Sequence, residues 1–146
     1  MFNPSRAEAR QFLVDAWRKR RDGLPATPLE TIAGNVVAMH PEYVGLLEAG
    51  AEGLAREWMP EDGETNPFLH LSLHLAIEEQ VAIDQPAGIR AALDRLLQRH
   101  GERHAALHDI LECLGETVWR AQRNRAPPDG AAYLECVAKA AGKGVP

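Results

Sequence analysis

The sequence predicts an all-α fold: a single-domain helical bundle of about four main helices plus two or three short helices. Helix-capping patterns recur along the chain, each followed by apolar residues at helical spacing. Sustained apolar–polar alternation between turn dipeptides, which is typical of strands, is missing from the sequence. The length of 146 residues suits one domain with its own core. We expect this domain to span residues 1–146, with its core at about 5–141 and a frayed tail over 142–146.

The first two helices are predicted from capping boxes. Ser5 with Glu8 begins a helix that should run to about Arg21, and Thr27 with Glu30 begins a second one. In a capping box the two side chains satisfy backbone N–H groups that have no partner inside the helix. Each pattern therefore marks a helix start rather than a loop.

A chain break follows the second predicted helix. Pro41 disfavours helical angles at His40, so the helix should end there, and a short helix over PEYVGLLEA should end at Gly50. The stretch 50–65 is expected to be the longest irregular region. Trp58 within it is expected to pack onto the core.

The rest of the chain predicts further helices. Asn66 is a favourable N-cap, and the proline after it suits a first helical position. Glycine and proline punctuation then separates four helices, over about 67–83, 86–100, 102–123 and 129–141. The linkers are short, so neighbouring long helices should be antiparallel.

Charge and hydropathy exclude some partners. Lys and Arg number 16 against 21 Asp and Glu, which gives a net charge of −5. An acidic chain is a poor match for nucleic acid or an anionic membrane surface. No apolar run approaches the ~18–20 residues of a membrane span. Neither nucleic acid nor membrane is therefore expected as a partner.

The N-terminal region and the cysteines predict a cytoplasmic protein. No apolar segment follows the basic residues near the start, so a secretory signal is not expected. Cys113 and Cys136 are too few for a disulfide framework, and their spacing matches no zinc knuckle. Because both lie in apolar helical patterns, they are expected to be buried free thiols.

One sequence pattern indicates a possible metal site: the string HxxxHxxxE occurs twice, in the helices expected over 67–83 and 102–123. Side chains four apart on a helix have β-carbons ~5–6 Å apart, so neighbouring members of a string can reach one metal ion. Imidazole and carboxylate ligands suit iron, zinc or manganese. The candidate ligands are His70, His74, Glu78, His104, His108 and Glu112. His40, at the chain break, is a further candidate.

The two strings are expected to lie level with each other, because alternate helices of an up-and-down bundle run parallel. The expected layers are His70 with His104, His74 with His108, and Glu78 with Glu112. The leading hypothesis is therefore a metal-binding protein whose His/Glu site is compatible with a dinuclear non-haem centre. An open metal position would permit hydrolytic or oxygen chemistry, on a small-molecule substrate that the sequence does not identify. Whether the protein is an enzyme stays open.

Two alternatives remain. The protein could be a non-catalytic interaction or structural module whose histidines form a core network or a subunit interface. Two of the histidines could instead hold haem. A homodimer is compatible with a small bundle that carries Trp58 and Trp119.

Several short strings also resemble those of the DUF1841 family, a proteobacterial domain of unknown function. They are MFNPSR, TPLE, HPEY, PEDGETNPFLH, NPFLHLSLHLAIEEQ, DQPAGIR and the second HxxxH string with ECLGE. The resemblance covers the chain from Met1 to about Val137. It implies a small, single-domain cytoplasmic bacterial protein and no established activity. In the family HPEY is often followed by another histidine, where this chain has Val44, so any ligand role of that position is lost here.

Overall fold

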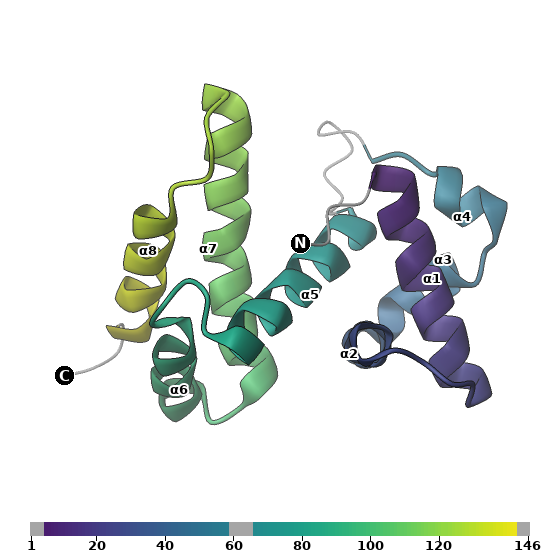
Figure 1. Ribbon diagram of the computed structural model, residues 1–146, viewed down its shortest axis with the longest axis horizontal. Helices are drawn as coiled ribbons and strands as arrows, with labels where there is room; N and C mark the ends of the chain where they lie inside the picture. Colours follow the sequence, from purple (N-terminus) through teal and green to yellow (C-terminus); the bar gives the residue numbers. More distant parts are fainter. Residues whose placement is uncertain (1–4, 59–65, 143–146) are drawn as a thin grey trace. The chain divides into compact units, whose positions relative to one another are not determined.

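The computed structural model describes residues 5–58 and 66–142 (Figure 1). Over these residues the chain is 79% helical and contains no strand, which confirms the all-α class. The chain divides into two compact units, Met1–Leu75 and Ala76–Pro146, at a point within one helix. A single domain over 1–146 therefore stays a prediction. None of the described helices combines the length and the apolar character needed to cross a membrane.

The first unit is built from short helices and the first half of α5. Both capping boxes are present: Ser5 and Glu8 exchange hydrogen bonds of 3.2 Å, and Thr27 and Glu30 exchange bonds of 2.9 and 3.1 Å. The predicted starts of the first two helices are thus confirmed. The elements are α1 (Arg6–Asp22), α2 (Pro28–Ala38), η1 (Pro41–Tyr43), α3 (Val44–Leu47), α4 (Ala51–Ala55) and α5 (Pro67–Ile83).

Helices α1 and α2 pack against each other and cross steeply, with α2 seen end-on beside α1 in Figure 1. Gly34 permits this approach. A β-carbon at this position would lie 3.1 Å from the Arg20 β-carbon and 3.2 Å from the Ala16 carbonyl oxygen. The core of this unit forms around that contact. Its fully buried members include Leu13, Val36, Val37, Leu47 and Leu71.

The segment between α2 and α5 was only partly predicted. The break before Pro41 is confirmed, since His40 has φ −128° and ψ 66° and a 3-10 turn follows. Trp58 packs against the core as expected, with its ring 6.0 Å from that of Phe68. Helix α4 lies inside the stretch that was expected to be irregular. The remainder of that stretch, 59–65, and the tail 143–146 lie outside the described residues.

The second unit contains the end of α5 and three further helices. These are α6 (Ile89–His100), α7 (Arg103–Asn124) and α8 (Gly130–Gly142). Helix α6 starts three residues later than predicted, because the Asp84 carboxylate accepts hydrogen bonds from the N–H groups of Gly88 and Arg90 and closes a turn there. Helices α7 and α8 pack together in opposite directions (Figure 1).

Two expectations about the second unit are wrong. Cys113 of α7 and Cys136 of α8 form a disulfide rather than two free thiols. The sequence pattern placed each cysteine on an apolar face but could not show that the two faces meet. The expected pairing of Glu78 with Glu112 also fails. Glu78, expected beside Glu112, forms an ion pair with Arg103 at the start of α7. The parallel register assumed shallow crossing angles, as in a regular bundle.

Candidate metal centre

His40 is the most constrained of the candidate ligands. Its side chain is 2% exposed, and its Nδ1 lies 2.8 Å from the Val36 carbonyl oxygen. A carbonyl oxygen only accepts hydrogen bonds, so Nδ1 is the nitrogen that carries the proton in the neutral ring. The lone pair is then on Nε2. A backbone carbonyl that fixes the tautomer in this way is a usual feature of metal-ligating histidines.

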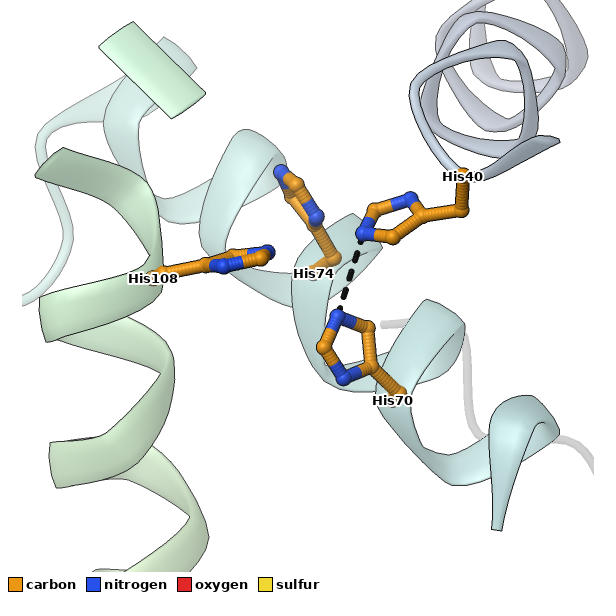
Figure 2. A group of neighbouring side chains, drawn as sticks. All are labelled: His40, His70, His74 and His108. Atoms are coloured by element: carbon orange, nitrogen blue, oxygen red, sulfur yellow. Dashed lines mark hydrogen bonds between the residues drawn. The ribbon is translucent and has the colours of Figure 1, made fainter. Parts of the chain in front are cut away.

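His70 and His74 approach His40 from α5. They are four residues apart and share one face of that helix. The Nε2 atom of His70 lies 3.1 Å from Nε2 of His40 (Figure 2). Each of the three histidines offers one ring nitrogen as a possible ligand, and these three nitrogens all lie within 4.8 Å of one another. These three residues form the candidate metal centre of the first unit, called the His40 cluster below.

Local chain chemistry explains how the His40 cluster is assembled. Pro41 ends α2 at His40 and turns the chain into the 3-10 helix. Asn66 accepts hydrogen bonds from the N–H groups of Phe68 and Leu69, at 3.0 and 3.3 Å, and so places the start of α5. His70 then lies one turn into the helix. The cluster depends on these two helix boundaries.

The aromatic ring of Tyr43 forms one wall of the His40 cluster. It lies parallel to the His40 ring, with 5.6 Å between centroids and 6° between planes. It also meets the His70 ring edge-on at 5.7 Å. Burial, with a smaller contribution from the Glu42 carboxylate, raises the pKa of the Tyr43 phenol above its usual value. The phenol therefore stays neutral and holds the His40 ring in place by stacking.

The cluster is partly closed to solvent. His74 is 0% exposed and lies between Leu71 and Leu75, which belong to the apolar core of the unit. His70 is half-buried. Any ion held here would therefore be in a largely apolar environment, approached from the side of His70.

The nitrogen spacing suits a metal ion. Two imidazole nitrogens bound to one zinc ion at ~2.0–2.1 Å in tetrahedral geometry are about 3.3 Å apart. The observed separation of 3.1 Å between Nε2 atoms is close to this value. It also suits a single N–H···N hydrogen bond, in which Nε2 of His70 donates to Nε2 of His40. Both descriptions place two imidazoles with their Nε2 atoms facing one point.

Glu78, the last member of the first string, lies in the second unit. Its carboxylate accepts two hydrogen bonds from the Arg103 guanidinium, at 2.7 and 2.9 Å. Its side chain is 14% exposed. This pairing raises the pKa of Arg103. The carboxylate is therefore occupied by a bidentate ion pair.

The second string lies on α7 in the second unit. The rings of His104 and His108 are 4.1 Å apart between centroids, and both residues are half-buried. Figure 2 draws His108 with the residues of the His40 cluster. Glu112 is exposed and lines a groove with Glu116. A ligand role for His104, His108 and Glu112 stays a prediction from the sequence.

Two residues of the cluster stood outside the main sequence prediction. His40 was only an addition to the two strings, although its Nε2 lies 3.1 Å from Nε2 of His70. Tyr43 was not a candidate at all. The signal was the string HPEY itself, because a histidine and a tyrosine three residues apart across a proline turn can stack.

A family model described as "Domain of unknown function (DUF1841)" matches residues 5–139. Neither the curated proteins nor the solved structures contain a match to the chain.

Proposed function

Because the chain belongs to the DUF1841 family, whose description names no activity, we propose a function from the geometry: the protein binds a transition-metal ion through His40, His70 and His74. The observation that carries the proposal is the meeting of two Nε2 atoms at 3.1 Å, with the Nδ1 proton of His40 held by Val36. His74 adds a third imidazole nitrogen within ligand range.

Metal binding at this cluster needs little rearrangement. In His40 the lone pair is already on Nε2, where it faces Nε2 of His70 at 3.1 Å. His70 has only to move its proton from Nε2 to Nδ1 to present a second lone pair to the same point. No net proton release is required when the rings are neutral. The apo cluster is thus a hydrogen-bonded version of the metal-bound one.

The ligand set selects the metal class. Three imidazoles and no thiolate suit zinc and iron, whereas manganese prefers oxygen ligands. A three-ligand site with an open position can lower the pKa of bound water or bind oxygen, so the proposal extends to hydrolytic or oxygen chemistry. A fourth protein ligand would instead close the site and make it structural.

The second HxxxHxxxE string supplies the candidate for that additional ligand or for a second ion. By the sequence prediction, His104, His108 and Glu112 are all candidates for that role. We therefore include His108→Gln among the variants below. A loss of metal in this variant would support a site that draws on both strings, and unchanged metal content would limit the site to three histidines.

The experiment is metal analysis of untagged protein, as purified and after reconstitution with zinc, ferrous iron or manganese. We expect about one equivalent in the native protein for one three-histidine site. His40→Gln should lose it, because glutamine keeps the approximate volume but is a poor ligand. His100→Gln is the matched control: this histidine lies outside the cluster and pairs with Asp109 at 2.7 Å.

A hydrogen-bonded core network is the second candidate function, and the His40–His70 contact favours it as well. In that case the protein is a non-catalytic module, and the histidines stabilise the packing of α5 against the end of α2. Native protein that takes up none of the three metals after reconstitution would contradict the metal proposal and leave this alternative.

A further inference from the structure

The Cys113–Cys136 disulfide lies outside the His40 cluster, and the proposed function makes no use of it. It joins the middle of α7 to α8 across a sequence separation of 23 residues. Two open cavities of about 360 and 560 Å³ border it, and both cysteines line each of them. The disulfide is therefore reached from the surface on more than one side.

The two sulfur-bearing residues differ in exposure. Cys113 is 4% exposed, whereas Cys136 is half-buried. Thiol–disulfide exchange begins when a thiolate attacks one of the two sulfurs, and access decides which one is attacked. An incoming thiolate would therefore meet Sγ of Cys136, and Cys113 would be the leaving group.

Charged side chains of both signs line the larger cavity. Arg99, Arg120 and Lys139 line it, each paired with a carboxylate of Asp109, Glu116 or Glu135. Glu112 lines the cavity as well. The Arg120–Glu116 and Lys139–Glu135 pairs are exposed, and exposed ion pairs are weak, so either cation can turn from its carboxylate to a thiolate at little cost.

Helix α8 has non-covalent attachments that do not depend on the disulfide. Tyr133 donates a hydrogen bond of 2.6 Å from its hydroxyl to Gln80, and Arg99 donates one of 2.6 Å to the Ala140 carbonyl oxygen. Tyr133 and Val137 are also buried. These contacts should keep the two cysteines near each other after the bond opens, so that it can form again.

From the two cavities and the unequal exposure, we propose that Cys113–Cys136 is a reversible thiol–disulfide exchange site in the folded protein. A thiolate of a dithiol reductant attacks Sγ of Cys136, which breaks the S–S bond and releases Cys113 as a thiolate. The second thiol of the reductant then attacks the mixed disulfide at Cys136. Two electrons pass to the protein, the two thiol protons end on Cys113 and Cys136, and the reductant leaves as its own disulfide.

The first test is reduction of the folded protein by dithiothreitol, followed by alkylation and intact-mass measurement. We expect two alkyl groups per chain, with the far-UV circular dichroism of the helices unchanged. Reduction that occurs only after denaturant unfolds the protein would overturn the proposal and make the bond a purely structural cross-link.

The second test separates the two sulfurs with single variants. Cys113→Ser leaves the Cys136 thiol, and Cys136→Ser leaves the Cys113 thiol in the same fold. With glutathione disulfide as the probe, the Cys136 thiol should form a mixed disulfide at least about tenfold faster, because access limits the buried thiol. Equal rates, or a faster Cys113, would overturn the assignment of Cys136 as the attacked sulfur. Circular dichroism of both variants checks that the helices are retained.

Discussion

The two units use buried polar groups in different ways. In the first unit the imidazoles of His40, which follows α2, and of His70 and His74 on α5 face one another beside an apolar core. In the second unit the Glu78 carboxylate is paired with the Arg103 guanidinium, and a disulfide joins two helices. The first arrangement brings imidazole nitrogens within 4.8 Å of one another, whereas the second neutralises opposite charges in an ion pair.

The HxxxHxxxE string occurs in both α5 and α7, so its histidines can be compared between these two helices. In α5 its two histidines meet a third one, supplied by the chain break at His40. In α7 the two histidines lie against each other, with 4.1 Å between ring centroids. Spacing on one helix therefore brings two ligands to one face, and a further ligand has to come from another element of the chain.

The largest expected effect is on metal affinity. We predict that His74→Gln lowers the affinity for zinc at least about 100-fold, because loss of an outer-shell partner alone costs about 10–100-fold. His104→Gln, a change at the first histidine of the second string, should alter the affinity little. Competition with a chromophoric chelator measures both. An equal loss in the two variants would show that the strings act alike and would break the comparison.

The second effect concerns the cross-link that only the second unit has. Cys113→Ser combined with Cys136→Ser should lower the free energy of unfolding by about 3 kcal/mol, the amount by which a disulfide closing a loop of this size constrains the unfolded chain. Hydrogen exchange should rise in α8 and stay unchanged in α1 and α2. Faster exchange in α1 and α2 would contradict the assignment of the effect to the second unit.

The third effect tests Arg10, a buried cation that anchors the first unit. Arg10 is 4% exposed, and its guanidinium donates hydrogen bonds of 2.9 and 2.7 Å to the carbonyl oxygens of Leu54 and Arg56. It also lies 4.6 Å from the Phe68 ring centroid. Arg10→Met keeps the length but not the donors, so we expect a loss of about 2 kcal/mol, near the cost of leaving buried acceptors unsatisfied. Urea unfolding measures it.

Arg6→Met is the control for that substitution, since Arg6 lies on the same helix and its side chain is 60% exposed in a 3.8 Å ion pair. It should change the stability much less than Arg10→Met does. Similar losses in the two variants would argue against a specific anchoring role for Arg10.

The smallest effect is a pH dependence in the first unit. The Lys19 ammonium, and then the backbone N–H of Thr27, lower the pKa of Glu30 below its ordinary value of 4.5. A carboxyl whose pKa is lower in the folded state contributes stability above its unfolded pKa and loses it as the pH falls through the folded pKa. Glu30→Gln should therefore flatten the acid side of a stability–pH profile without changing the alkaline side. Thermal unfolding across that range is the measurement.

Local chemistry made the helix boundaries predictable. Ser5 and Thr27 cap their helices with side-chain oxygens within three residues, and Pro41 acts on the residue before it. Part of the His40 cluster was predictable as well, because it also depends on residues close together in the sequence. His70 and His74 share a helix face whatever surrounds that helix, so their pairing was visible in the sequence.

The sequence by itself determined the all-α class, the main helix starts and the pairing of His70 with His74, because each depends on residues a few positions apart. Only the tertiary structure decided that His40 meets His70 across 30 residues, that Glu78 pairs with Arg103, and that Cys113 bonds to Cys136. These contacts depend on crossing angles and on which faces of different helices meet. Many side chains set such quantities together, and no short pattern encodes them.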